Sequence, residues 1–328
     1  MYIIAAAIGL IMLLILWSRI EMKILTTTEY IVETDKLGSC SLATNFIVLA
    51  DLHNHVIGQD NKKIINKIDS IDPDFIVSAG DLITKGQLCI PSNGFDLLKK
   101  LSKKYTIYYG YGNHEIHFDH LLDQLDGKVE GIDISKEDVD RVRTLHSNWL
   151  QYKNSLKDLG IIILDDEQTL IKLQEGPSRI RISGLSLEPK YYRKFKNNTD
   201  RSTVEYSLNE KPMAVNEYLN NNIGQVDDDE EFNLLIAHSP IYFEDYVKWG
   251  ADLTVSGHIH GGMIRIPFIG GLLSPQVSIF PKFDSGRFTK DGKDMIISRG
   301  LGSHSLMIRI FNPPELLVIR LQNHSSHS

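Results

Sequence analysis

The sequence predicts an α/β fold built around a largely parallel sheet and preceded by a helix that could cross a membrane. Short apolar runs, typical of strands buried on both faces, alternate with segments whose apolar residues recur at helical spacing. Several of these runs end directly in Asp, Asn or His, and the carboxyl ends of strands are where α/β sheets commonly bind ligands. With 328 residues, the chain can form one large α/β domain or two smaller ones.

The N-terminal stretch from Tyr2 to Trp17 contains no charged residue and no proline. As a helix rising about 1.5 Å per residue it would cover roughly 24 Å, and the flanking residues could extend it across the hydrocarbon core of roughly 30 Å. Trp17 and Arg19 suit the membrane interface, the first as an aromatic belt residue and the second by snorkelling. We therefore expect residues 1–23 to form an uncleaved, single-pass membrane anchor.

A cleaved signal peptide and a buried N-terminal helix are the two other interpretations of this stretch. A signal peptide would carry basic residues before the apolar run and a small-residue cleavage site after it. Here Ala5–Ala7 precede the Leu-rich part, and Arg19-Ile20-Glu21 follows it. The nearest basic residues, Arg19 and Lys23, lie after the run, so the positive-inside rule favours a cytoplasmic location for the rest of the chain. The opposite orientation stays open.

A linker and a first strand are expected at residues 24–44, one domain at 45–321 and a polar tail at 322–328. Tyr30-Ile31-Val32 indicates the strand, and Gly38-Ser39 a polar connection. The domain begins with a β-α-β alternation, with strands expected at 45–50, 75–79 and 106–109 and helices at 62–71 and 95–104.

These three strands run into polar motifs, namely Asp51-Leu52-His53, Gly80-Asp81 and Gly112-Asn113-His114-Glu115. Because β-α-β crossovers are right-handed and leave successive strands parallel, we expect the motifs to meet at one edge of a sheet.

The second half of the chain continues this pattern less regularly. Helices are expected at 139–156 and 211–223, and strands at 161–164, 179–183, 232–237 and 252–256. The last two strands end in His238 and in Gly257-His258-Ile259-His260. Apolar runs at 295–298, 306–311 and 316–319 are predicted to close a second sheet. The basic and aromatic segment Lys190–Arg201 could form a loop over the site.

The composition excludes some classes of function. A formal net charge of −7 argues against sequence-independent nucleic-acid binding, so we expect no nucleic-acid partner, but it is compatible with a small phosphate ester held by metal ions. Cys40 and Cys89 form neither a C-x-x-C pair nor a disulfide framework. The acidic run Asp227–Glu231 lacks the spacing of a calcium loop and is interpreted as a solvated connection. The sequence does not indicate the oligomeric state.

The strand ends supply a set of seven candidate metal ligands: Asp51, His53, Asp81, Asn113, His238, His258 and His260. These nitrogen and oxygen ligands suit divalent ions such as Mn, Fe, Zn or Co. Seven ligands are too many for one tetrahedral zinc ion. They suit two divalent ions that share a bridging carboxylate and leave positions open for water and substrate.

The order of the motifs resembles that of the calcineurin-like metallophosphoesterase superfamily. The resemblance spans residues 51 to 260 and rests on Asp51-Leu52-His53, Gly80-Asp81, Gly112-Asn113-His114-Glu115, His238 and Gly257-His258-Ile259-His260. The apolar N-terminus, the Gly-His-x-His-Gly-Gly form and the segments Ser298–Gly302 and Asn312–Glu315 are similar to those of the bacterial membrane-anchored or exported members.

The resemblance implies a four-layer α/β/β/α sandwich of two mixed sheets. It also implies that one metal is held by Asp51, His53 and His260, a second by Asn113, His238 and His258, and that Asp81 bridges them. A hydroxide between the two ions would attack phosphorus in line. His114 would act as general acid on the leaving oxygen or stabilise the transition state, and Glu115 would orient it.

From this resemblance we expect a phosphoesterase that hydrolyses a phosphodiester or pyrophosphate bond of a lipid-linked or envelope substrate. One alternative is an exported phosphomonoesterase that acts on wall or envelope phosphate groups. Another is a non-catalytic membrane scaffold, which predicts lost ligands, whereas none of the seven is lost. His55 also suggests the polymerase and histidinol phosphatase type of phosphoesterase, but the later motifs do not follow its order. His304 is a candidate substrate contact.

Overall fold

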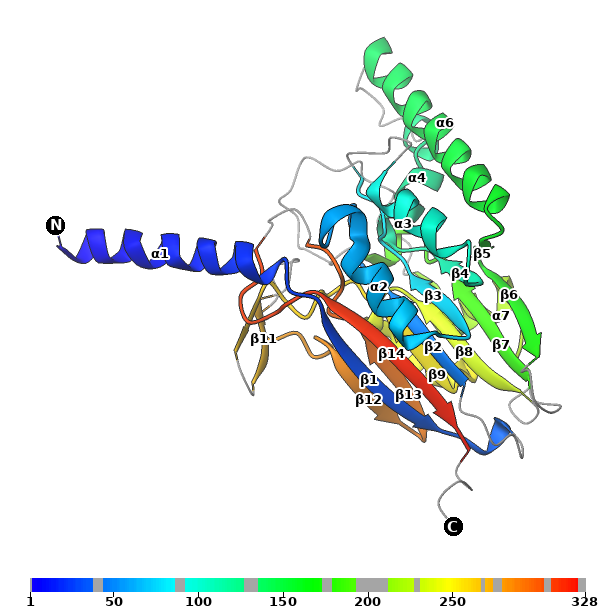
Figure 1. Cartoon of the computed structure of the whole chain (residues 1–328). Coiled ribbons are helices and arrows are strands. Elements are labelled where there is room, and N and C mark those ends of the chain that lie inside the picture. Colours follow the sequence, from blue (N-terminus) through cyan, green and yellow to red (C-terminus); the bar gives the residue numbers. More distant parts are fainter. Residues whose placement is uncertain are drawn as a thin grey trace.

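The computed structural model describes residues 2–37, 44–85, 92–126, 135–172, 179–192, 212–226, 231–266, 269–273, 279–303 and 308–323. In these residues two six-stranded sheets pack face to face, helices cover both outer faces, and helix α1 projects from one end (Figure 1). The expected four-layer α/β/β/α sandwich of two mixed sheets is confirmed.

The first sheet has the strand order β1-β14-β2-β3-β4-β5. Its strands are β1 (Thr26–Glu33), β14 (Glu315–Gln322), β2 (Thr44–Leu49), β3 (Phe75–Ala79), β4 (Ile107–Gly110) and β5 (Ile162–Leu164). β14 runs antiparallel to β2, and all other neighbours are parallel. The outer face is covered by α2 (Lys62–Ile71), α3 (Asn93–Leu101) and α6 (Lys136–Asp158). Two short helices, α4 (Asn113–Asp119) and α5 (Asp123–Asp126), connect β4 to α6 along the chain.

The second sheet has the order β12-β13-β9-β8-β7-β6. Its strands are β12 (Gly286–Lys290), β13 (Lys293–Ile297), β9 (Leu253–Ser256), β8 (Phe232–Ala237), β7 (Arg179–Leu185) and β6 (Glu167–Lys172). Helices α7 (Val215–Asn222) and α8 (Phe243–Trp249) pack on its outer face. A separate hairpin consists of β10 (Ile264–Ile266) and β11 (Gly270–Leu273), and short 3-10 helices lie at Asp35–Leu37, Gln59–Asn61, Pro189–Tyr192 and Pro240–Tyr242.

Alternate residues of the central strands face two different apolar layers. In β2, Phe46 and Val48 face the layer between the sheets, whereas Ile47 and Leu49 face the helices. All four are fully buried, which is why the strand has a continuous apolar sequence. Burial of four such side chains stabilises the strand by roughly 6–12 kcal/mol as an upper estimate, and this fixes the position of Asp51 directly beyond it.

Most expected elements are present within a few residues of their predicted bounds, and the strand predicted at 295–298 is β13 of the second sheet, but the last two C-terminal strands were assigned wrongly. β14 lies in the first sheet beside β2, not in the second sheet. Its side chains at 316 and 318 face the helices and those at 317 and 319 the layer between the sheets, so the apolar pattern suits either sheet. Residues 308–311 of the predicted strand at 306–311 form no strand and contribute an isolated bridge between Ile264 and Ile310.

Some features of the sequence lie outside the described residues. These are Cys40, Cys89, residues 193–201 of the predicted loop, residues 227–230 of the acidic run, and His304.

Helix α1 (Tyr2–Glu21) is the one described helix that is long and apolar enough to cross a membrane. Most of its apolar side chains are exposed, so within this chain the helix is not buried against the rest of the described residues. Its last turn is packed on the domain, because Ser18 Oγ accepts a hydrogen bond from Arg309 N (2.9 Å) and Glu21 Oε2 accepts one from Phe311 N (2.8 Å). Residues 22–25 then lead directly into β1.

Candidate metal centre

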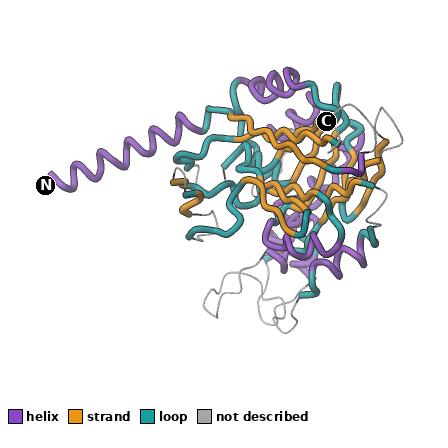
Figure 2. Tube along the Cα trace, turned by 90° about the horizontal axis from the view of Figure 1, so that it is seen from below, coloured by secondary structure: helices purple, strands orange, loops and turns teal. Residues whose placement is uncertain are grey.

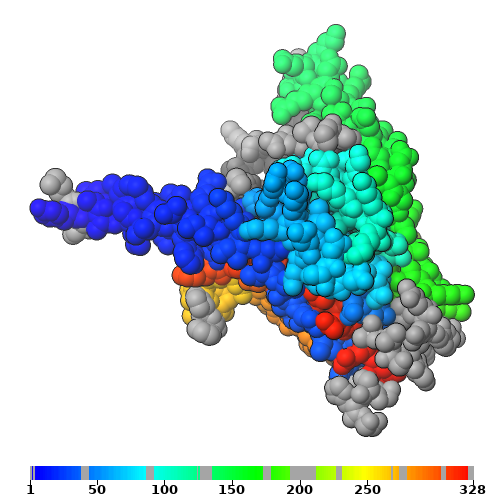
Figure 3. All heavy atoms as spheres, viewed as in Figure 1, coloured from blue at the N-terminus to red at the C-terminus, as the bar shows by residue number. Residues whose placement is uncertain are grey.

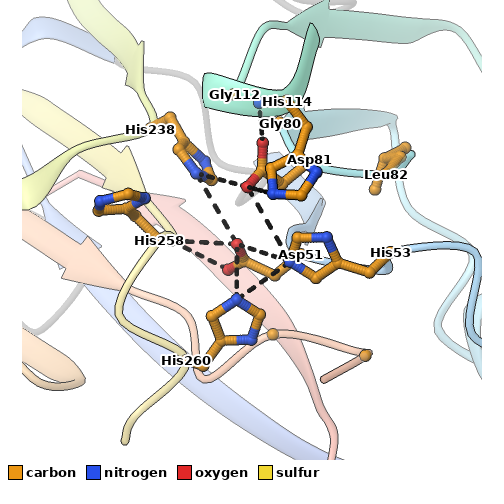
Figure 4. Close-up of polar contacts among 12 residues, drawn as sticks. Asp51, His53, Gly80, Asp81, Leu82, Gly112, His114, His238, His258 and His260 are labelled. Carbon is orange, nitrogen blue, oxygen red and sulfur yellow. Dashed lines mark hydrogen bonds and ion pairs between the residues drawn. The ribbon is translucent and has the colours of Figure 1, made fainter. Parts of the chain in front are cut away.

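Five strand ends converge on a cluster of acidic and imidazole side chains (Figure 4). The cluster follows β2 at Asp51 and His53, β3 at Asp81, β4 at Asn113 and His114, β8 at His238, and β9 at His258 and His260. The strands are parallel neighbours within each sheet, so their carboxyl ends share one edge of the sandwich. The motifs that the sequence placed at separate strand ends are therefore neighbours in the structure.

Asp51 lies fully buried on one side of this cluster. Its Oδ1 is 3.5 Å from His260 Nε2, 3.8 Å from His238 Nε2 and 4.0 Å from His53 Nε2. Both carboxylate oxygens also accept a hydrogen bond from the backbone N of His258 at 3.1 Å. Asp51 thus contacts histidines from both sheets.

Asp81 lies on the other side and also contacts several imidazoles. Its Oδ2 is 3.2 Å from His238 Nε2, 3.8 Å from His114 Nε2 and 3.9 Å from His53 Nε2. Its Oδ1 accepts a hydrogen bond from the backbone N of His114 at 2.8 Å. Asn113 is next to this contact, and its buried Oδ1 has no hydrogen-bond partner among the described residues.

The ligand atoms form overlapping groups with the spacing of metal sites. One group contains Asp51, His53 and His260, and another Asp81, His238 and His258, with all ligand atoms of a group within 4.8 Å of one another. A third group contains His53, Asp81 and His114. The cluster is thus wide enough for two neighbouring ions, and Asp81 belongs to two of the three groups.

Backbone conformation separates these residues from ordinary loop positions. Asp51, His53, Asp81, His258 and His260 have φ of 51°, 47°, 55°, 73° and 56°. A non-glycine residue in this left-handed region costs about 1–3 kcal/mol, and such strain persists where surrounding structure enforces it, often at functional sites. Five such residues in one cluster indicate that the fold keeps these side chains in place at the cost of backbone strain.

Glycines in two motifs allow the backbone to approach the carboxylates. A Cβ on Gly112 would lie 2.2 Å from Asp81 Oδ1, and a Cβ on Gly257 would lie 2.5 Å from Asp51 Oδ2. Both distances are far below van der Waals contact, so any side chain at these positions would displace a carboxylate. This explains why the motifs have glycine directly before Asn113 and His258.

Outer contacts orient the histidines. The Nδ1 of His238 is 2.7 Å from the carbonyl oxygen of Ala79, so Nδ1 donates a hydrogen bond there and Nε2 is the ring nitrogen that faces Asp81. The side-chain amide of Asn312 donates to the carbonyl oxygens of His260 (2.7 Å) and Gly262 (2.6 Å) and thereby fixes the loop after β9.

Glu115 holds the backbone around Asp81. Its two oxygens accept hydrogen bonds of 2.8–3.1 Å from Asp81 N, Leu82 N, Gly112 N and the Tyr109 hydroxyl. Burial and the neighbouring Asp81 charge raise the pKa of Glu115 to about 7. The His114 imidazole is oriented from another side, because its Nδ1 accepts a hydrogen bond from Lys85 N at 2.9 Å.

Burial and charge act in opposite directions on the ionisable groups. Burial raises the pKa of Asp51 to about 7, although His238 beside it works against this. Burial also works to raise the pKa of Asp81, but His114, His238 and His53 hold it well below its usual range. For His238, burial works to lower the pKa, but Asp81 and Asp51 raise it to about 9.

Metal binding is therefore expected to release protons and to become tighter as the pH rises from about 6 to about 9, because ligands must lose their protons before they bind a metal. In metal-free protein at neutral pH, a pKa of about 9 keeps His238 protonated and a pKa of about 7 leaves Asp51 partly protonated. Calorimetric titration with Mn²⁺ in two buffers of different ionisation enthalpy measures this release. An enthalpy that is the same in both buffers would contradict it.

Three residues around the cluster had no predicted role. Tyr192 packs edge-on against His258 with ring centroids 5.2 Å apart, and it belongs to the described part of the predicted loop Lys190–Arg201. Asn312 lies in a segment whose sequence was singled out without a role. Arg309 is buried and donates to the carbonyl oxygens of Arg299, Gly300, Gly302 and Asn312.

A family model described as calcineurin-like phosphoesterase matches residues 44–262, from the start of β2 to just beyond His260. The chain belongs to the calcineurin-like phosphoesterase family. Family membership decides against the polymerase and histidinol phosphatase type. His55, which suggested that type, lies outside the three ligand groups, with its Nε2 3.1 Å from the carbonyl oxygen of Met22.

Similar proteins match most of the chain. The metallophosphoesterase YkuE of Bacillus subtilis is 22% identical over 314 residues, which cover 93% of this chain and 88% of YkuE. A metallophosphoesterase of Aquifex aeolicus is 22% identical over 93% of this chain and 95% of its own length. The UDP-2,3-diacylglucosamine pyrophosphatase LpxG of Chlamydia trachomatis is 21% identical over 84% of this chain and 82% of its own length. As a calcineurin-like phosphoesterase, the chain is a phosphoester hydrolase.

Proposed function

We propose that this calcineurin-like phosphoesterase is a membrane-anchored enzyme that uses two divalent ions to hydrolyse a phosphodiester or pyrophosphate bond of a lipid-linked substrate. The observation that carries the proposal is the pair of adjacent ligand groups, the second of which contains Asp81, with Asp81 Oδ2 also 3.9 Å from His53 Nε2 of the first. The groups lie close to the base of α1, because His55 Nε2, two residues after His53, is 3.1 Å from the carbonyl oxygen of Met22. In the proposed site, Asp51, His53 and His260 bind the first ion. The second ion is bound by His238, His258 and Asn113, and Asp81 bridges the two.

The residues fit two ions of the Mn, Fe, Zn or Co type. All donors are carboxylate, amide or imidazole, as such ions prefer. The buried Asn113 Oδ1 has no hydrogen-bond partner among the described residues, which suits a ligand atom. His238 is fixed with Nε2 toward the cluster. Bound ions would lower the pKa of a water molecule and neutralise charge on the phosphoryl oxygens.

In this proposal, the His114 side chain contacts the reacting phosphoryl group. Its Nδ1 accepts a hydrogen bond from Lys85 N, so a neutral ring carries its proton on Nε2, the atom that points into the cluster 3.8 Å from Asp81 Oδ2. A protonated ring would place an N–H against the Lys85 N–H. Of the two roles considered for His114, this favours donation of a hydrogen bond in the transition state over full proton transfer.

Membrane anchoring rests on α1. Each large apolar side chain of α1 that stays in water loses roughly 1.5–3 kcal/mol of favourable transfer free energy, which it would gain in the hydrocarbon core of a bilayer. The hydrogen bonds of Ser18 and Glu21 to Arg309 and Phe311 support retention of the helix rather than its removal as a signal peptide. Arg19 and Lys23 follow the apolar run and favour a cytoplasmic catalytic domain.

The bond type is proposed from both similarity and geometry. LpxG, which is similar over most of its length, is named as a pyrophosphatase of a diacylated sugar nucleotide. A site close to the base of a membrane helix suits a substrate that carries acyl chains. An exported phosphomonoesterase has the same ligand set and differs in substrate and in the side of the membrane.

Purified full-length protein in detergent tests the proposal when assayed with Mn, Fe, Zn and Co in turn. An aryl phosphodiester and a nucleoside diphosphate ester should be cleaved faster than an aryl phosphomonoester. Preference for the monoester would favour the phosphomonoesterase, and inactivity with every metal would favour the scaffold. Protease accessibility in intact cells decides the side of the membrane.

A further inference from the structure

The end of the sandwich around α1 carries exposed apolar side chains beyond those of the helix itself. Ile269 (66% exposed), Ile279 (68%) and Phe280 (55%) belong to the β10–β11 hairpin and the segment that returns beside β11, and Phe311 (53%) lies next to it. Such side chains rarely gather on a surface that faces only water. We call these four residues the hairpin patch.

The two aromatic residues of the hairpin patch are held out by strained backbone. Phe280 has φ 48° and Phe311 has φ 54°. Bulky residues seldom adopt this left-handed conformation, and it persists only where the surroundings enforce it. Phe280 N donates to Leu272 O at 3.1 Å, and Phe311 N donates to Glu21 Oε2 at 2.8 Å. The fold thus maintains the outward position of both rings.

The hairpin patch is joined to the base of α1. Phe311 N bonds to Glu21 and its ring lies 6.1 Å from that of Trp17. Arg265 N in β10 donates to Ile310 O at 3.0 Å, next to Phe311. Figures 1 and 2, turned by 90° relative to each other, both place the hairpin at the α1 end of the domain, and Figure 3 shows its yellow and orange surface beside the helix base.

The same structural unit includes the metal loop. Arg265 Nη1 donates to Gly261 O at 2.9 Å, and Gly261 directly follows His260. Asn312, directly after Phe311, donates to His260 O. The hairpin patch is therefore connected by a few hydrogen bonds to the loop that carries His258 and His260.

Charged residues near the base of α1 indicate what covers the patch. Arg19, Lys23 and Lys63 are exposed there, and Lys63 Nζ bonds to the carbonyl oxygen of Lys23 at 3.1 Å. Asp284, a carboxylate that contacts the hairpin, is paired with Arg265 at 2.9 Å. Apolar side chains next to basic ones, at the exit of an apolar helix, match the acyl chains and anionic headgroups of a bilayer.

We propose that the hairpin patch is a second lipid contact, which inserts into the same bilayer leaflet that α1 enters and sets the metal centre at the level of the lipid headgroups. This inference rests on the proposed membrane anchoring. With two contacts, the domain cannot pivot freely about α1, so the metal centre keeps a fixed height and tilt above the membrane.

Fluorescence quenching in vesicles of phosphatidylethanolamine and phosphatidylglycerol tests the contact. In full-length protein with Cys40 and Cys89 replaced by Ser, single cysteines at Ile269, Ile20 and Leu170 carry an environment-sensitive dye, and lipids brominated along the acyl chains act as quencher. Leu170 is an exposed apolar residue on β6, at the far side of the domain, and is the matched control. We expect strong quenching at Ile269 and Ile20, and none at Leu170.

The outcomes separate this inference from the proposed function. Quenching at Ile20 but no more at Ile269 than at Leu170 would overturn the second contact and leave the anchor intact. Absence of quenching at Ile20 as well would overturn both. As a second measurement, Ile269→Glu with Phe280→Glu should leave cleavage of a soluble aryl phosphodiester unchanged and lower cleavage of a vesicle-borne phosphodiester at least about fivefold; equal rates on the vesicle substrate would contradict the contact.

Discussion

Replacing Asp81 with asparagine is expected to remove most of the bound metal and to lower turnover on the order of 10³-fold or more. Asp81 Oδ2 lies 3.2 Å from His238 Nε2 and 3.9 Å from His53 Nε2, so the change takes a negative charge from both ligand groups. Asparagine keeps the shape of the side chain and the oxygen that accepts from His114 N. Metal content after dialysis and the rate on an aryl phosphodiester measure the effect.

Asp69→Asn is the matched control, because Asp69 is a surface carboxylate whose partners are Lys104 and Tyr105. This variant should retain the metal content and activity of the unaltered protein. Thermal unfolding with a chelator present verifies that both variants are folded. If Asp81→Asn bound as much metal as Asp69→Asn, the proposed bridging position of Asp81 would be wrong.

Replacing His114 with alanine is expected to leave both ions bound and to lower turnover by about 10²–10³-fold, the usual effect of losing one donor to a developing negative charge. The loss should be similar for aryl diesters with good and poor leaving groups, because a neutral imidazole stabilises phosphoryl oxygen charge without transferring its proton. Steady-state rates over a series of substituted phenols, together with metal content, measure this.

His120→Ala is the control for His114, since His120 pairs with Asp123 on the surface and lies outside the three ligand groups. A loss that grows steeply as the leaving group becomes poorer would show that His114 is a general acid instead. Loss of an ion from His114→Ala would make it a ligand, as its place beside His53 and Asp81 in the third group allows.

The central part of the fold could be predicted because its determinants are local. Strands such as β2 and β3 are buried on both faces and therefore have continuous apolar sequences, and each polar motif follows its strand directly. A parallel arrangement then requires that Asp51 and Asp81 share one edge of the first sheet, whereas the place of His238 beside them depends on how the second sheet packs on the first. Most residues of the candidate site could therefore be predicted from the order of these motifs along the chain.

Contacts between distant segments were not predictable in the same way. β14 pairs with β2 across most of the chain, and its apolar pattern suits a central strand of either sheet. The apolar run around Arg309 looked like a strand, whereas in the structure the buried guanidinium is stabilised by several carbonyl oxygens of a neighbouring loop. The contact from Asn312 to His260 O likewise depends on the folded loop.

The two-ion centre is tested most directly by locating the metal ions by anomalous diffraction in crystals grown with Mn²⁺, for the unaltered protein and for His258→Ala and His260→Ala. We expect two peaks, on either side of Asp81, in the unaltered protein. His258→Ala should lose the peak beside His238, and His260→Ala the peak beside His53. A single peak in the unaltered protein, or loss of the same peak from both variants, would contradict the two-ion centre.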